Sequence, residues 1–324
     1  MMTARAIATL VLFLIWTALL IPLQMLLIKI GSPWRRSLPH FYHRSVAWLL
    51  RIKVRRIGVA AAPAPVLFVS NHISWLDIVV LSAALPASFI AKKEVNDWPF
   101  FGLLARLQRT VFVERNNRHR TAEHRDEMRE RLEQGDNLIL FPEGTSSDGL
   151  RIHNFKSAFF AVAEQPIRGR LPFVQPISLG YAKLNHMPVG RRWMRIFAWV
   201  GDEDLVPHLW RFLKSGPSEA VVELHQPVTM ADFASRKGMA AWCHQRVLEG
   251  LSDINAGREP GPRTPPKPLH VTPSQPQAQA SAPESSAPES SAPESSAPET
   301  SAPETSVPET SVPEQNGDSV PPAA

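Results

Sequence analysis

Short apolar runs alternate with amphipathic stretches through the middle of the chain. Each run is bounded by polar or turn-forming residues and has the length of a buried strand. The predicted strands are Val66–Ser70, Ser88–Ala91, Thr110–Val113, Leu138–Phe141, Phe173–Leu179, Arg195–Gly201 and Ala220–Leu224. Thr121–Gln134, followed by Gly135, and Ala231–Leu251 have the spacing of helices. The alternation predicts an α/β fold with a mixed sheet flanked by helices.

The N-terminal region has a different pattern. Ala6–Ile28 is an apolar run without a charge, and it exceeds the about 20 residues that a helix needs to cross a bilayer core. A cleaved signal peptide has a shorter apolar region that ends at small residues, whereas this run ends in Leu-Leu-Ile. We therefore expect a retained anchor. It either spans the membrane or, if Pro22 breaks the helix, lies half-inserted at the interface.

The C-terminal region predicts a disordered tail. From Ser281 the chain repeats SAPES and SAPET units, with a proline in each and almost no large apolar side chain, so it cannot build a core. The predicted organisation is an anchor at 1–30, a basic interfacial helical segment at 31–60, a globular domain at 61–256 and the tail at 257–324. A single cysteine, Cys243, excludes an internal disulfide framework.

Charge adds a class of partner. The chain has a net charge of +5, and because the tail is acidic the globular part is more basic than this value indicates. A basic domain suits nucleic acid, an anionic membrane surface or a phosphorylated substrate. Basic residues are also denser after the apolar run than before it, which predicts that the domain lies on the cytoplasmic side.

Candidate catalytic residues follow the predicted strands, where α/β sheets usually carry their sites. His72 comes directly after the first strand, and Asp77 follows within one turn of a predicted loop-to-helix junction. In that geometry Asp77 can fold back, orient the His72 imidazole and support its cation, which makes His72 a candidate general base. A structural histidine at a strand end is the alternative.

Other strand ends carry groups that can bind an anion. The turn FPEGTSSD at Phe141–Asp148 contains Gly144, which allows close approach of a ligand to backbone N–H groups. Arg115, Lys93 and Lys156 are cations able to hold a phosphate. Each of them alone is typical of a solvated charge, and the turn alone is typical of an ordinary Pro-Gly turn.

Taken together, these blocks resemble the lysophosphatidic acid acyltransferases (1-acyl-sn-glycerol-3-phosphate acyltransferases) of the glycerolipid acyltransferase superfamily. NHISWLD is similar to the N-H-x(4)-D block, TVFVER to the arginine block, FPEGTSS to the F-P-E-G-T-R-S block and QPIS to the fourth block. The order and intervals fit from Val66 to Leu179. The resemblance implies that 61–256 is an acyltransferase domain with the fold of that superfamily.

The resemblance also implies roles. His72 would be the general base that takes the proton of an acceptor hydroxyl as it attacks an acyl thioester, and Asp77 would orient it. The residues implied for binding the acceptor headgroup are Lys93, Arg115, Glu143, Gly144, Thr145 and Lys156. The donor would be acyl-ACP or acyl-CoA, with no cofactor and no metal. The expected acceptor is 1-acyl-sn-glycerol-3-phosphate, which would give phosphatidic acid.

One departure keeps a second acceptor open. The family has an arginine after the threonine of its third block, whereas this chain has Ser146. Loss of a charge-assisted contact to phosphate weakens the case for a phosphate headgroup. The turn and the segment Gly201–Trp210 resemble a bacterial subgroup that acylates lyso-ornithine lipid to ornithine lipid.

The expected location is the bacterial inner membrane, with the active site on its cytoplasmic face and against anionic lipid. Two rival functions remain. A nucleic-acid binder suits the basic domain, but the anchor and the lack of a nucleic-acid-binding motif argue against it. A catalytically dead membrane scaffold suits the proline-rich tail, but the intact pair of His72 and Asp77, together with Glu143, argues against that.

Overall fold

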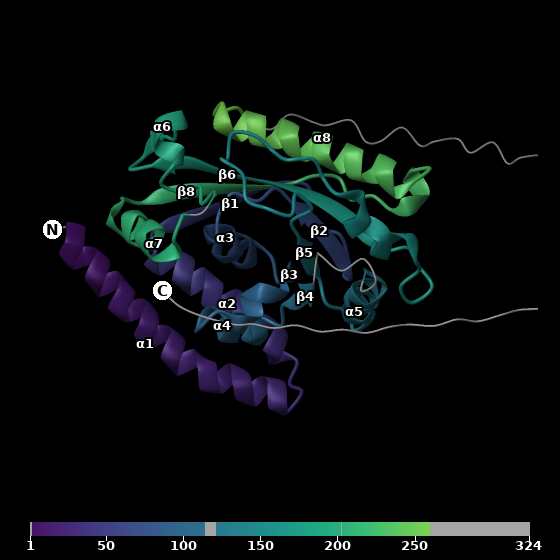
Figure 1. Ribbon diagram of the computed structural model, residues 1–324, viewed down its shortest axis with the longest axis horizontal. Coiled ribbons are helices and arrows are strands. Elements are labelled where there is room, and N and C mark those ends of the chain that lie inside the picture. Colours follow the sequence, from purple (N-terminus) through teal and green to yellow (C-terminus); the bar gives the residue numbers. More distant parts are fainter. Residues whose placement is uncertain (1, 114–120, 202, 260–324) are drawn as a thin grey trace, which may run out of the picture. The chain divides into compact units, whose positions relative to one another are not determined.

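A single mixed sheet organises the part of the chain that the computed structural model describes, residues 2–113, 121–201 and 203–259, all within one compact unit. The strands are β1 (Ile52–Gly58), β2 (Val66–Ser70), β3 (Ser88–Lys92), β4 (Val111–Val113), β5 (Leu138–Leu140), β6 (Phe173–Leu184), β7 (Met187–Pro188) and β8 (Ser218–Leu224). Their order is β1-β8-β6-β2-β5-β3-β4, with β7 paired to β6 (Figure 1). β6 is antiparallel to β7 and β8, and the other pairs are parallel, which confirms the predicted mixed sheet.

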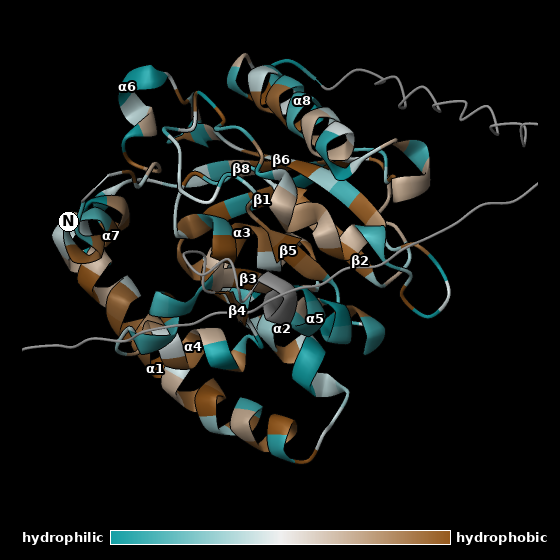
Figure 2. Cartoon of the chain, turned by 45° about the vertical axis from the view of Figure 1, so that its right-hand side comes forward, coloured by the Kyte–Doolittle hydropathy of each residue, from teal (hydrophilic) through white to brown (hydrophobic). Residues whose placement is uncertain are grey.

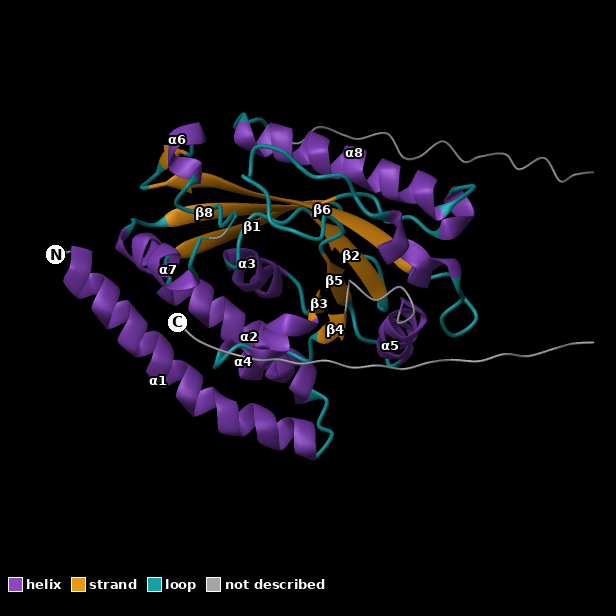
Figure 3. Cartoon of the chain, viewed as in Figure 1, coloured by secondary structure: helices purple, strands orange, loops and turns teal. Residues whose placement is uncertain are grey.

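Helices cover both faces of this sheet. They are α1 (Met2–Lys29), α2 (Trp34–Leu49), α3 (Leu76–Ala84), α4 (Phe101–Leu107), α5 (Thr121–Glu133), α6 (Arg191–Met194), α7 (Leu205–Lys214) and α8 (Arg236–Asn255). Within the described residues, short 3-10 helices lie at Lys93–Asp97, Ser157–Glu164 and Met230–Asp232. Figure 3 shows α8 on one side of the sheet and α2, α3 and α4 on the other.

The core is divided between the two faces by the alternation of side chains along the strands. In β2, Val66 and Phe68 join the apolar cluster beneath α2 and α3, whereas Leu67 and Val69 join the cluster beneath α5 and α8. Every residue of β2 is buried because this strand lies in the middle of the sheet. The two-sided burial explains why the strand reads as an unbroken apolar run.

One predicted strand is wrong. Arg195–Gly201 contains no strand and instead continues from α6 in a series of turns. Met194, Phe197 and Ala198 are buried, which is the spacing of a helical turn, and the Phe197 and Ala198 N–H groups both donate to the Met194 carbonyl. A short apolar run fits either structure, and here the helical spacing decides it.

The segment predicted to be helical at 31–60 is only partly so. α2 accounts for its first half, but residues 52–58 form β1, which pairs in parallel with β8 at the edge of the sheet. Lys53, Arg55 and Arg56 give this strand its basic character, as is common for protected edge strands. The sheet therefore begins before residue 61. The tail from residue 260 onward lies outside the described residues, so its disorder stays a prediction.

Helix α1 is continuous through Pro22 and is long and apolar enough to cross a membrane. Two of its polar side chains face the domain: the Thr17 hydroxyl lies 2.9 Å from the Tyr42 hydroxyl, and Gln24 Nε2 donates to the Leu107 carbonyl at 2.8 Å. Figure 2 shows the apolar colouring along α1. The exposed large apolar residues of α1 are Met2, Ile7, Val11, Leu12, Leu14, Ile15, Leu19, Leu23, Met25 and Leu26.

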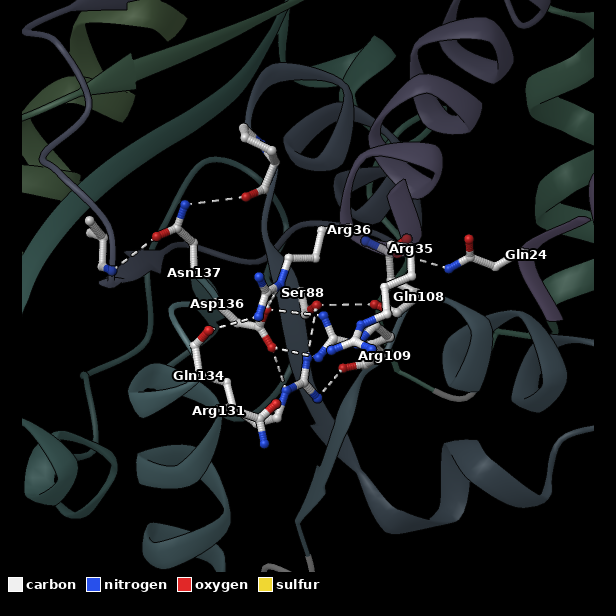
Figure 4. Close-up of polar contacts among 12 residues, drawn as sticks. Gln24, Arg35, Arg36, Ser88, Gln108, Arg109, Arg131, Gln134, Asp136 and Asn137 are labelled. Carbon is white, nitrogen blue, oxygen red and sulfur yellow. Dashed lines mark hydrogen bonds and ion pairs between the residues drawn. The ribbon is translucent and has the colours of Figure 1, made fainter. Parts of the chain in front are cut away.

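A cluster of arginines around Asp136 joins α2 to the domain (Figure 4). Asp136 accepts from Arg36 Nε at 2.6 Å, from Arg109 Nη2 at 2.8 Å and from Arg131 Nε at 2.8 Å. These contacts hold the pKa of the Asp136 carboxyl below its ordinary value, although its burial acts in the opposite direction. Because Arg36 belongs to α2 and the other three residues to the domain, the cluster fixes the N-terminal helices to the sheet.

Candidate active site

The predicted pair of His72 and Asp77 forms at the carboxyl end of β2. The chain leaves β2 through Asn71, whose side chain bridges to the backbone of Leu179 in β6, with hydrogen bonds of 2.9 and 2.8 Å. Helix α3 then begins at Leu76, which places Asp77 in its first turn. Asp77 Oδ2 lies 2.8 Å from His72 Nδ1, and the Asp77 side chain is completely buried. The predicted geometry is confirmed.

Hydrogen bonds to Asp77 define the state of the pair. Besides His72, its Oδ2 accepts from the N–H groups of Ile73 at 2.6 Å and Ser74 at 2.9 Å. Its Oδ1 accepts from the Tyr181 hydroxyl at 2.8 Å. A carboxylate surrounded by donors is the ionised form, so His72 Nδ1 carries a proton and donates it to Asp77. Nε2 of His72 is then the nitrogen able to accept a proton.

The His72 ring is held from its other side as well. Phe141 stacks on it with 4.2 Å between ring centroids and 20° between ring planes. The side chain is 21% exposed and lines the cavity described below, and among the described residues Nε2 has no hydrogen-bond partner. The ring is therefore fixed in orientation while its basic nitrogen stays accessible.

Glu143 supports this loop through its backbone. Its Oε1 accepts from the His72 N–H and its Oε2 from the His153 N–H, both at 2.7 Å. Burial raises the pKa of the Glu143 carboxyl to about 7, although both hydrogen bonds favour the ionised form. Glu143 is not among the residues that line the cavity. Glu143 thus links the third block to the first through backbone N–H groups. These contacts differ from the direct contact with an acceptor headgroup that the resemblance implies.

The turn after Glu143 does reach the cavity. Gly144, Thr145 and Ser146 all line it, and Gly144 has a φ of 78°, which suits glycine. The Ser146 hydroxyl donates to the Trp199 carbonyl at 2.5 Å. The side chain at this position therefore ties down the loop after α6, in the place where the resemblance leads us to expect an arginine.

The structure does not place either of the two predicted lysines in the wall of the cavity. Lys93 begins the 3-10 helix after β3 and Lys156 precedes the one at Ser157–Glu164; both side chains are exposed and neither residue lines the cavity. Lys92, the neighbour of Lys93, does line it. Arg115 lies outside the described residues, so its role stays a prediction. Among the described residues, His, Cys, Asp and Glu side chains form no group able to hold a metal ion.

An apolar cavity of about 490 Å³ runs from the His72 ring toward the N-terminal helices. Its walls come from α1, α2, α3, α4 and α7, with Phe13, Ile21, Val46, Val79, Leu104 and Leu209 among the lining residues. A volume of this size with mostly aliphatic and aromatic walls suits a hydrocarbon chain. The cavity thus extends from the accessible imidazole nitrogen between apolar walls.

Two residues near the site were not found from the sequence. The buried His208 of α7 accepts from Trp75 Nε1 at 3.0 Å through Nδ1, and its Nε2 donates to the Ala198 carbonyl at 3.0 Å. Burial lowers the pKa of His208, consistent with this neutral form. Trp75 lines the cavity beside His72. Tyr181, the partner of Asp77, is the other residue, and no local signal in the sequence connects it to the site.

The site thus places an accessible imidazole nitrogen at one end of an apolar cavity. Comparisons with known proteins give the class: residues 51–180 match the family model Acyltransferase. The chain is 44% identical over 243 residues to the lyso-ornithine lipid O-acyltransferase of Brucella abortus, which covers 74% of this chain and 91% of that protein. The chain therefore belongs to the acyltransferase family.

Two further likenesses come from 1-acyl-sn-glycerol-3-phosphate acyltransferases. The enzyme of Neisseria gonorrhoeae is 43% identical over 101 residues, which are 31% of this chain and 40% of that protein. The crystal structure of the 1-acyl-sn-glycerophosphate acyltransferase of Thermotoga maritima aligns with a TM-score of 0.55 and 20% identity, over 79% of this chain and 98% of that one. The latter likeness supports the fold alone.

Proposed function

We propose that this acyltransferase moves a fatty acyl group from the thioester of acyl-ACP or acyl-CoA to the free hydroxyl of a lysolipid, with lyso-ornithine lipid as the acceptor. The observation that carries the proposal is the His72–Asp77 pair, whose accessible Nε2 lies at one end of the apolar cavity. This arrangement provides a base for a hydroxyl and a space for an acyl chain in one site.

The reaction needs one proton acceptor and no nucleophile from the protein. Nε2 of His72 takes the proton of the acceptor hydroxyl as its oxygen attacks the thioester carbonyl. The C–O bond forms, the C–S bond breaks, and the imidazolium returns the proton to the departing thiolate. Asp77 stabilises the imidazolium, and Glu143 holds the His72 backbone in place through its N–H.

The choice of acceptor differs from the first expectation from the sequence. A phosphate acceptor was expected, but the extensive match is to a lyso-ornithine lipid acyltransferase, and the match to the Neisseria phosphate-type enzyme covers 31% of this chain. Ser146 agrees with the lyso-ornithine acceptor, because its hydroxyl bonds to the Trp199 carbonyl and offers no cation to a phosphate. An amino-acid headgroup has less need of that cation.

The proposed location is the cytoplasmic face of a bacterial inner membrane, with α1 lying along the interface. Arg5 of α1 donates to the Lys214 and Ser215 carbonyls at the end of α7, while Thr17 and Gln24 bond to the domain further along. A helix bonded to the domain near both ends and in its middle presents its apolar side outward, as an interfacial helix does. Although α1 is unbroken at Pro22, this arrangement favours a helix that lies at the interface over a spanning helix.

The experiment is acyl transfer by washed membranes that carry the chain. Acyl-ACP or acyl-CoA is offered with lyso-ornithine lipid and with 1-acyl-sn-glycerol-3-phosphate in parallel, and membranes with the His72→Ala variant serve as the control. We expect ornithine lipid to form faster than phosphatidic acid, and neither with the variant. A preference for the phosphate acceptor would reject the proposed acceptor, and full activity of the variant would reject the proposed base.

A further inference from the structure

An exposed basic and aromatic surface lies on α6, next to the active site but outside the cavity. We call Arg191, Arg192, Trp193 and Arg195 the α6 patch; all four side chains are exposed, and Trp193 is exposed by 53%. The Arg192 guanidinium lies 6.0 Å from the centroid of the Trp193 ring. Met194, which lies between Trp193 and Arg195 in the chain, points inward and is buried. The patch is thus an outward turn anchored by one apolar side chain.

The charge of the α6 patch is not neutralised locally. The sequence has no acidic residue from Lys183 to Val200. Among the described residues, no carboxylate lies within ion-pair distance of the three patch arginines, and the nearby Glu203 is paired with Arg211 at 2.6 Å. Three arginines without an ion-pair partner in the described part of the chain, around an exposed tryptophan, form a site of positive potential that can attract an acidic partner.

The residues beside the α6 patch in the chain contact both loops of the active site. Met194 packs so closely on Gly149, just after the third block, that a Cβ there would lie 3.0 Å from the Met194 sulfur. The Trp199 N–H donates to the Ile73 carbonyl at 3.0 Å, and its carbonyl accepts from Ser146. Trp193 is six positions before Trp199, which lines the cavity, so the two Cα atoms lie within about 22 Å of each other.

We propose that the α6 patch docks an acidic acyl carrier protein, whose thioester arm then enters the cavity beside Trp199. The inference rests on the proposed function, because it assigns a surface to the donor of that reaction. Arg and Trp are the residues enriched at the centres of protein interfaces, and unpaired arginines there select a partner of opposite charge. A flexible thioester arm explains why the docking surface and the reacting nitrogen need not be adjacent.

Two other occupants fit the α6 patch less well. Free acyl-CoA is a small ligand and favours a concave site, whereas the patch is an exposed turn and none of its residues lines the cavity. A lipid surface is already provided for by the exposed apolar side of α1. In both views α6 lies away from the length of α1, near the end of the sheet and α8 (Figures 1 and 2).

The test separates the two donors. The double variant Arg191→Glu with Arg192→Glu is compared with the wild type on acyl-ACP and on acyl-CoA of the same chain length, with the same lysolipid in the same detergent. We expect kcat/KM for acyl-ACP to fall by about tenfold or more and kcat/KM for acyl-CoA to stay within about twofold. Rising salt should also weaken the wild type with acyl-ACP more than the variant.

A charge-matched control is available at the other end of β6. Arg168 and Arg170 are exposed and precede β6, whereas α6 follows it, and the 12 residues of β6 span about 40 Å. The double variant Arg168→Glu with Arg170→Glu makes the same change in net charge and should leave both donors unaffected. Trp193→Ala, which changes no charge, should lower kcat/KM for acyl-ACP alone.

Several outcomes would overturn the inference. An equal loss with both donors, or no loss with acyl-ACP, would show that the α6 patch does not dock a carrier. Loss of binding to anionic vesicles, with an equal loss for both donors, would assign the patch to the membrane. A wild type active only with acyl-CoA would reject the carrier but leave the proposed acyl transfer intact, whereas a wild type inactive with both donors and both acceptors would reject the proposed function itself.

Discussion

Two pairs of histidine and carboxylate occur beside this sheet among the described residues, and only one of them faces the cavity. His72 and Asp77 are 2.8 Å apart, with the His72 ring 21% exposed at the cavity. His225 and Glu223 are 3.6 Å apart and almost fully buried, and His225 Nε2 lies 2.7 Å from the Ser178 hydroxyl. Both pairs join an imidazole to a carboxylate. What differs is whether the second ring nitrogen meets a substrate space or another side chain.

The buried pair has a structural setting. Ser178 also donates to the Val247 carbonyl of α8 at 2.9 Å, and Gly250 packs so tightly above it that a Cβ there would lie 2.2 Å from the Ser178 oxygen. Ser178, His225 and Glu223 have the residue types of a hydrolytic triad, but none of the three lines the cavity. Access, rather than composition, separates a catalytic cluster from one that joins β6, β8 and α8.

The largest effect expected from this comparison is the loss of catalysis on removing His72. His72→Ala should lower kcat by about 10²- to 10⁴-fold, which is the usual contribution of a general base, while binding to membranes is unchanged. The matched variant His225→Gln removes an imidazole from the other pair and should keep kcat within a few-fold. Steady-state kinetics on equal amounts of folded protein check both. Similar losses in the two variants would remove the distinction between the pairs.

The second effect concerns the pH dependence of stability through Glu143. Burial raises the pKa of Glu143 to about 7 in the folded protein, so the folded state holds this proton more tightly than the unfolded chain. Its contribution to stability is therefore fully present below the ordinary pKa of a glutamate and is lost as the pH rises through about 7. The shift corresponds to roughly 3 kcal/mol.

The measurement is the difference in unfolding free energy between the wild type and Glu143→Gln, which cannot ionise. The advantage of the wild type should shrink as the pH rises from about 4.5 to about 7.5, since the titrations of other groups cancel in the difference. Parallel pH profiles of the two proteins would mean that Glu143 titrates normally and that its burial costs less than the structure indicates.

The third effect tests the structural role of the buried pair. Ser178→Ala removes a hydroxyl that bonds to His225 and to Val247, and it leaves both partners without that bond in a buried, closely packed site. We expect a loss of about 1–3 kcal/mol in unfolding free energy with kcat unchanged. Thermal unfolding in detergent and a parallel activity assay measure it. A fall in kcat without a loss of stability would give the second pair a part in the reaction.

The two pairs also show which parts of the site the sequence can predict. His72 and Asp77 were found because they are neighbours in the chain, so a loop followed by a helix is enough to bring them together. Tyr181 was not found, since its contact with Asp77 depends on the register of β6 against β2. Glu143 was found as a residue but not in its contacts, because its partners are backbone N–H groups that no side-chain pattern records.

The same limits apply to the fold. The central strands were predicted well because burial on both faces gives continuous apolar runs. β1 was missed because its exposed positions carry lysine and arginine, and these basic residues led to the prediction of an interfacial helix. Arg195–Gly201 was predicted as a strand because a short apolar run carries no period of its own, and its contacts with Tyr181 decide its structure.

The smallest effect comes from the hydrogen bond that the sequence did not predict. Tyr181→Phe removes one donor from Asp77, which keeps its bonds to His72, Ile73 and Ser74. The His72–Asp77 hydrogen bond therefore remains, but the Asp77 carboxylate has one donor fewer. We expect kcat to fall about three- to tenfold, or about 1 kcal/mol, with KM unchanged. The other tyrosine of the chain gives a control: Tyr42 is bonded to Thr17 of α1, so Tyr42→Phe should leave kcat unaffected. If the two variants behave alike, Tyr181 is a packing residue, and the catalytic pair is oriented by the backbone of its own loop alone.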